Sequence, residues 1–183
     1  VLTDALECCW HCRNAKLRGV QAEHGDYLFM HGENIDVDGF RLNGNYSFQY
    51  CRNVVIRNAE IHSKDAFWNT EDVTVYDSVV DGEYLGWHSR NLRLVNCRIS
   101  GTQALCYAEN LVLENCTLGE DADLCFEYSS VHAEIKGRVH SVKNPRSGRI
   151  VAEEYGDIIL DEHCKAPANC SIETGKAQSG EAA

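Results

Sequence analysis

A pattern of about 19 residues recurs at least six times along the chain, and this repeat limits the possible folds more than any other feature. Its most regular position, which we call the anchor, is asparagine in all copies but one, and successive anchors are 20, 19, 19, 19 and 19 residues apart. The anchors are Asn14, Asn34, Asn53, Asp72, Asn91 and Asn110. Self-similarity at a fixed period of this length predicts a solenoid, in which each repeat stacks on its neighbours.

Apolar residues alternate with polar ones after each anchor. The positions one and three residues after it are apolar in every copy, as in Val54 and Ile56 after Asn53. Five residues after the anchor a glycine, asparagine or aspartate recurs, and the apolar alternation then resumes. Alternation with a period of two predicts β-strands, and the small or polar residue between them marks a bend.

We therefore expect an all-β fold, a single-stranded parallel β-helix (solenoid) with about 19 residues per coil. Equivalent residues on neighbouring coils would lie ~4.8 Å apart, so the anchor asparagines could hydrogen-bond to one another along the stack. Asparagine also tolerates the left-handed backbone of a sharp corner. The main rival, a leucine-rich repeat, needs a helix or an extended arc after each strand, but residues 82–87 lack a helical apolar period.

The residue before each anchor alternates in charge from one copy to the next. These residues are Arg13, Glu33, Arg52, Glu71, Arg90 and Glu109. If the coils stack in this register, each charge lies between two opposite charges, whereas a slipped register would place like charges together. The charge ladder therefore supports the same stacking as the anchors.

The repeat also suggests where the domain ends. The pattern loosens after Leu118, so we expect a β-helix over residues 1–163, with capping strands near 138–163 that close its C-terminal end. Residues 164–183 are expected to form a polar C-terminal tail. The chain begins at Val1 without an initiator methionine, and we expect the solenoid to be truncated at its N-terminal end.

The composition argues against several classes of partner. With 17 basic and 28 acidic side chains the net charge is −11, which would repel a phosphate backbone, so we expect no nucleic-acid partner. No apolar run approaches the ~20 residues needed to cross a bilayer, so we expect no membrane partner. No serine-hydrolase elbow, P-loop or dinucleotide fingerprint occurs, and we predict no cofactor.

Ten cysteines occur, mostly at repeat positions that other copies fill with Val, Ala, Ser or Thr. This favours free thiols in a reducing compartment and predicts a cytoplasmic protein. His11 and His31 share a column near Cys8, Cys9 and Cys12, but their spacing matches no structural zinc signature. We therefore predict no metal site.

Several segments together resemble a known family. They are residues 44–48 (GNYSF), 63–69 (SKDAFWN), 82–87 (GEYLGW), 126–129 (FEYS) and 144–145 (NP). Over roughly residues 8–160 the chain resembles the bacterial domain-of-unknown-function 3737 family. The resemblance implies a right-handed parallel β-helix of the pectate-lyase-like kind, with further coils before Val1. This family has no established activity, so the resemblance assigns no catalytic residue.

The stretch before each anchor collects tryptophan, tyrosine, histidine and acidic residues. The position five before the anchor is apolar, as in Phe48 and Phe67, which suggests that it faces the core and that the tryptophans four before the anchor face outward. The alternative buries the tryptophans and exposes the tyrosines and histidines. Exposed rings suit stacking on sugars, so we predict polysaccharide or oligosaccharide binding. The candidate substrate-binding residues are Asp26, Trp68, Tyr84, Trp87 and His88.

Two other functions fit the same residues. The aromatic stripe could be a protein interface, which would make the chain a structural scaffold, a protein-interaction solenoid or a homo-oligomer. Alternatively, Asp65 and Glu83 on adjacent coils could approach the ~5 to 5.5 Å carboxylate separation of retaining glycosidases, as in a glycoside hydrolase, or the chain could be a polysaccharide lyase. Because the acids vary from coil to coil without a clear cluster, binding or structure is favoured over catalysis.

Overall fold

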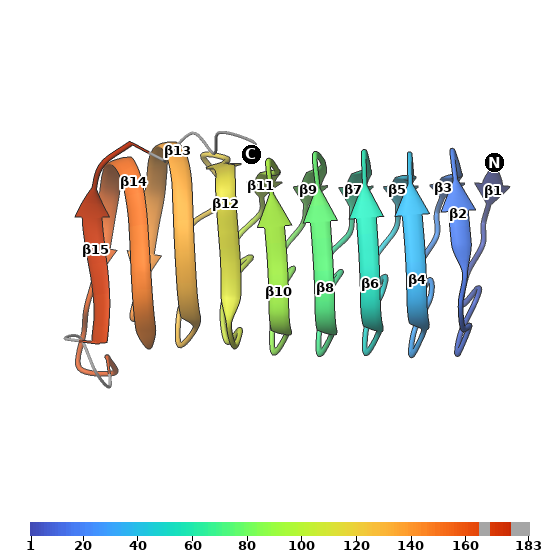
Figure 1. The fold of residues 1–183 in the computed structure, drawn as a ribbon, viewed down its shortest axis with the longest axis horizontal. Coiled ribbons are helices and arrows are strands. Elements are labelled where there is room, and N and C mark those ends of the chain that lie inside the picture. The colour runs from blue at the N-terminus through green and yellow to red at the C-terminus, as the bar shows by residue number, and fades with distance from the viewer. Residues whose placement is uncertain (165–168, 177–183) are drawn as a thin grey trace, which may run out of the picture.

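The computed structural model describes residues 1–164 and 169–176. Within them the chain forms a parallel β-helix of about nine turns, with roughly 19 residues per turn and no α-helix. The chain rises through each front strand, crosses to the back, descends and advances toward the C-terminus, so the coils are right-handed (Figure 1). The predicted β-helix is confirmed. The leucine-rich repeat is wrong, because the strand that follows each anchor is followed by a second strand and not by a helix.

Each repeat contributes one strand to a front sheet and a strand of three residues to a back sheet. After β1 (Leu2–Thr3), the pairs are β2 (Lys16–Arg18) and β3 (Gln21–Glu23), β4 (Glu33–Asp38) and β5 (Arg41–Asn43), β6 (Arg52–Arg57) and β7 (Glu60–His62), β8 (Glu71–Tyr76) and β9 (Val79–Asp81), and β10 (Arg90–Val95) and β11 (Arg98–Ser100). Strands of successive coils pair in parallel, and their register matches the sequence repeat.

The C-terminal coils are built from longer strands. These are β12 (Leu111–Leu118), β13 (Ser130–Lys143), β14 (Ser147–Ile159) and β15 (Cys170–Thr174). The strands expected as a cap near 138–163 are the ends of β13 and β14, which pair in parallel and continue the stack. Part of the expected polar tail forms β15, because Cys170 and Ile172 alternate inward and pack against the core. Residues 165–168 and 177–183 of that tail lie outside the described residues.

The anchors form the expected ladder. All six have positive φ values, between 52° and 57°, as the sharp corner requires. Nδ2 of Asn34 donates to Oδ1 of Asn14 at 3.0 Å, and Nδ2 of Asn53 donates to Oδ1 of Asn34 at 2.7 Å. The ladder resumes where Asn91 donates to Asp72 at 2.8 Å. It is interrupted before Asp72, because a carboxylate has no N–H to donate to Asn53.

Restoring this missing link is expected to stabilise the protein. The Asp72→Asn variant keeps the oxygen that accepts from Asn91 and adds a donor toward Asn53, so urea unfolding should show a gain of about 1 kcal/mol, the net value of one hydrogen bond. Asp157→Asn, at an exposed position of β14, removes the same charge and serves as the control. Equal unfolding midpoints for the two variants would contradict the interrupted ladder.

A column of phenylalanines fills the interior, five residues before the anchors. The Phe29 and Phe48 rings stack with centroids 5.0 Å apart, and Phe67 continues the column 6.0 Å from Phe48. Phe40 packs its edge against both Phe29 and Phe48. All four rings are buried, and the prediction that the position five before the anchor faces the core is confirmed for Phe29, Phe48 and Phe67. Cys9, on the first coil, is exposed.

The stretch before each anchor is not a regular β-strand, although the inward and outward positions inferred for it from the sequence assumed one. It is a series of turns in which alternate residues have positive φ, as in Tyr27, Phe29 and His31 (58°, 63° and 57°). Its backbone N–H groups still reach the neighbouring coil, as in the 3.0 Å bond from His31 to the Gln49 carbonyl. Because such a backbone does not alternate its side chains strictly between two faces, the column three residues before the anchor reaches the surface and so do the three tryptophans four before it, whereas Gln49 and Cys106 in that second column are buried.

Candidate functional site

An elongated groove runs along the solenoid axis, between the turns and the front sheet. It consists of two adjoining hollows of about 660 and 400 Å³, which share His88, Tyr107 and Glu109. We call this feature the groove. Its lining residues are His31, Gly32, Glu33, Tyr50, Arg52, Asn69, Thr70, Glu71, His88, Arg90, Tyr107, Glu109, Tyr128, Asn144 and Arg146. One wall is formed by the residues three before the anchors, and the other by the charge ladder.

The first wall is a column of rings with two different halves. In the N-terminal half the rings stack nearly flat, with His11 and His31 5.1 Å apart at 3° and His31 and Tyr50 4.8 Å apart at 16°. In the C-terminal half the rings are tilted, with 38° between His88 and Tyr107. Flat-stacked rings cover one another and present their edges, whereas tilted rings leave part of their faces open. Asn69 separates the two halves.

The second wall is the charge ladder in the predicted register. The Glu71 carboxylate forms ion pairs with two guanidiniums, 3.5 Å from Arg52 and 3.0 Å from Arg90, and the Glu109 carboxylate lies 3.9 Å from the Arg146 guanidinium. Three arginines and three glutamates line the groove, so this wall is formally neutral in a protein with a net charge of −11. Sequence reasoning missed Arg146, since it follows the region where the repeat loosens.

Four of the predicted binding residues gather beside this groove. Trp87 contacts Tyr84 with ring centroids 4.6 Å apart and His88 at 6.2 Å, and Trp68 lies 6.5 Å from His88. His88 lines the groove itself, while the two tryptophans are half-buried behind it. The Trp87 indole donates to the Gln103 carbonyl at 3.0 Å. Tyr107, which was not among the predicted site residues, completes the cluster 5.0 Å from Trp87.

Asp26 lies apart from this cluster. Its Oδ1 accepts the backbone N–H of Asn45 at 2.6 Å, and Asn45 in turn accepts the backbone N–H of Lys64 at 3.2 Å. The column eight residues before the anchors thus joins neighbouring coils through side-chain to backbone bonds. These contacts give Asp26 a structural role in joining neighbouring coils.

The two acids considered for catalysis have opposite environments. Asp65 is buried, and this burial raises the pKa of its carboxyl above the usual value. The nearby Lys64 ammonium acts to lower that pKa, and the Glu83 carboxylate acts to raise it. Glu83 is exposed, and its carboxylate lies 3.3 Å from the Lys64 ammonium. Neither residue lines the groove. The geometry therefore gives catalysis by this pair no support.

Comparison with known proteins agrees with the resemblance seen in the sequence. The model of the family described as "Protein of unknown function (DUF3737)" matches residues 1–173. The chain belongs to the DUF3737 family. No curated protein and no solved structure shows a significant match. Because the family description carries no activity, the function of this DUF3737 chain must be inferred from its surface.

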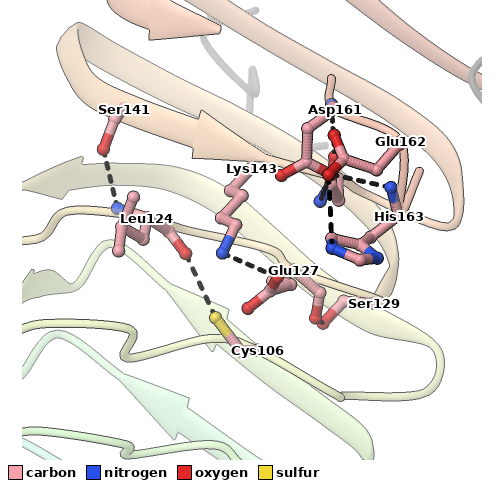
Figure 2. A network of polar contacts seen from close by, with 10 residues as sticks. Cys106, Leu124, Glu127, Ser129, Ser141, Lys143, Asp161, Glu162 and His163 are labelled. Carbon is pink, nitrogen blue, oxygen red and sulfur yellow. Dashed lines mark hydrogen bonds and ion pairs between the residues drawn. The ribbon is translucent and has the colours of Figure 1, made fainter. Parts of the chain in front are cut away.

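A shielded ion pair stands at the C-terminal end of the groove in this DUF3737 chain. Lys143 Nζ lies 3.0 Å from Glu127 Oε1, and Figure 2 shows the lysine side chain directed at that carboxylate. The Glu127 carboxylate raises the pKa of Lys143, and burial together with Glu127 raises the pKa of the Tyr107 hydroxyl. The pair joins the coil of Tyr128 to the end of β13. We interpret it as support for the groove wall, and no sequence pattern pointed to it.

Other chemistry is sparse in the part of the DUF3737 chain that the structure describes. That part holds no group of three or more His, Cys, Asp or Glu residues suited to a metal ion. The ten cysteines are free, including Cys97 and Cys116 on adjacent coils. Among residues 1–164 and 169–176, no helix is long and apolar enough to cross a membrane.

Proposed function

We propose that the groove binds an oligosaccharide or polysaccharide, without catalysing a reaction on it. The observation that carries this proposal is a continuous groove whose one wall is a row of aromatic rings and whose other wall is a row of paired arginines and glutamates. Elongated ligands suit an elongated groove. The tilted rings of His88 and Tyr107 would supply apolar contact to sugar ring faces.

The charged wall matches the hydrogen-bonding character of sugar hydroxyls. Arginine only donates and glutamate only accepts, and along the wall they alternate at each coil, ~4.8 Å apart. A hydroxyl both donates and accepts, so a glycan lying along the groove can satisfy both groups in turn. Because the three arginines and three glutamates of this wall balance in charge, and Glu71 is paired with both Arg52 and Arg90, placing an uncharged polyol over them leaves no isolated charge without water.

The same neutrality predicts a ligand without charge and a binding affinity almost independent of salt. From about 0.01 M to about 1 M salt the Debye length falls from ~30 to ~3 Å, which would strongly weaken binding of an acidic glycan. For a neutral hexasaccharide we expect Kd to change by less than about fivefold, the equivalent of the ~1 kcal/mol that an exposed ion pair contributes at most.

Isothermal titration calorimetry with cellohexaose, xylohexaose, mannohexaose and chitohexaose tests both statements. Binding of at least one of them, with a Kd that barely changes with salt, is the expected result. If none binds and light scattering shows that the chain self-associates, the groove is a protein interface and the proposal is wrong. Tight binding of hexagalacturonate that disappears at high salt would contradict the neutral ligand class.

A further inference from the structure

The ring column along the groove lacks one member. Rings occupy the position three before the anchor in His11, His31 and Tyr50, and again in His88 and Tyr107, after which Tyr128 continues the column. The coil between Tyr50 and His88 carries Asn69 instead. Asn69 is exposed and lines the larger hollow together with its two neighbours in the column. The column is therefore open at one level only, near the middle of the groove.

The gap comes from the side chain and not from a change in the backbone. Asn69 has a φ of 53°, close to the 58° of Tyr50 and the 57° of His88. The coil is hydrogen-bonded on both sides, since Tyr50 N–H donates to the Trp68 carbonyl and Asn69 N–H donates to the Trp87 carbonyl, each at 3.0 Å. A ring at position 69 would thus fit the column as its neighbours do.

The gap has the width of one ring. Tyr50 and His88 stand two coils apart, roughly 2 × 4.8 Å, and flat-stacked rings elsewhere in this column lie 4.8 to 5.1 Å from their neighbours. Each flanking ring is supported on its far side, Tyr50 by His31 at 4.8 Å and His88 by Tyr107 at 5.4 Å. The two rings are therefore held in place before any ligand arrives, which lowers the entropic cost of binding.

Polar groups surround the gap on its other sides. At the base of the gap, the Asn69 amide offers both a hydrogen-bond donor and an acceptor. Across the groove at the same level stands Glu71 with the guanidiniums of Arg52 and Arg90, whose side chains are 70% and 54% exposed. Ring faces on two sides and hydrogen-bonding groups on two others match a sugar, which has apolar ring faces and hydroxyls around its edge.

We propose that one sugar ring of the bound glycan inserts at Asn69, stacked between Tyr50 and His88, with its hydroxyls toward the Asn69 amide and the Arg52 and Arg90 guanidiniums. This inference rests on the proposed function and narrows it. The ring that enters belongs to an uncharged glycan, and this one sugar contributes most of the affinity. Sugars before and after it follow the groove along the column.

The Asn69→Tyr variant tests the insertion, because it fills the gap with a side chain that the column already accepts at Tyr50 and Tyr107. The variant should fold, with an unfolding midpoint equal to or above that of the original chain. Its affinity for the tightest-binding hexasaccharide of the panel above should fall by about tenfold or more, equivalent to ~1.4 kcal/mol. Asn69→Ala keeps the gap and removes only the amide, so its affinity should fall less than that of Asn69→Tyr.

His11→Tyr is the matched control, since His11 belongs to the same ring column two coils away from Tyr50 but lies outside the residues that line the groove, and the affinity of this variant should be unchanged. A folded Asn69→Tyr variant that binds as tightly as the original chain would overturn the insertion while leaving the proposed glycan binding intact. If the original chain binds no hexasaccharide, both fail. The two failures are therefore distinguishable.

Discussion

Replacing Phe48 by alanine is expected to lower the free energy of unfolding by about 4 kcal/mol, the usual cost of truncating a buried phenylalanine. Phe48 is fully buried at the centre of the phenylalanine column, with stacked contacts to Phe29 and Phe67 and an edge contact to Phe40. Neighbouring coils are fixed by parallel pairing and cannot collapse into the cavity. Urea unfolding followed by circular dichroism measures the change.

Val79→Ala is the control for this prediction. Val79 lies on β9 with its side chain outward and 37% exposed, so its truncation should change the unfolding free energy by no more than ~0.5 kcal/mol. The core described here would be contradicted if the two variants were equally stable.

A second large effect is expected from Gly101→Ala, which should lower the unfolding free energy by more than about 4 kcal/mol or prevent folding. A Cβ at this position would clash with the Gly82 carbonyl oxygen of the adjacent coil, and the φ of +103° is one that an alanine rarely adopts. Backbone atoms of both coils would have to separate to relieve this contact.

Gly19→Ala separates these two causes. Gly19 also has a positive φ, +60°, but a Cβ there meets nothing within 4 Å, so only the left-handed penalty of about 1 to 2 kcal/mol applies. The thermal unfolding midpoint of Gly101→Ala should therefore be far below that of Gly19→Ala. Similar midpoints would mean that the coils do not approach each other as closely at Gly101 as described.

Much of the fold could be predicted because single residues meet two structural requirements at once. An asparagine such as Asn53 or Asn91 both adopts the left-handed corner and hydrogen-bonds to the next coil, so its recurrence marks the stacking register directly. Alternation after the anchor placed Val54 and Ile56 in the core correctly. The strand β15 was not predicted, because its alternation, Cys170 and Ile172, is too short to stand out in a polar segment.

The candidate site could be predicted only in part. Trp68, Tyr84, Trp87 and His88 were brought together because they belong to two adjacent repeats, whereas Asp26 was assigned to binding although it bonds the backbone of Asn45. Bulky residues rarely adopt a positive φ, so no sequence pattern indicated that alternate residues such as Tyr27 and Phe29 would do so. Without that backbone, neither the burial of Asp65 nor the exposure of His88 beside the half-buried Trp87 could be derived.

Nuclear magnetic resonance of the ¹⁵N-labelled protein, titrated with the hexasaccharide panel, tests the central claim most directly. The account predicts that the largest shifts fall on the backbone amides of groove residues, with Asn69, His88 and Tyr107 among the most affected. Amides of the back sheet, such as that of Val79, should not move. Shifts centred on another face, or no shifts with any glycan of the panel, would contradict the assignment of this groove as the binding site.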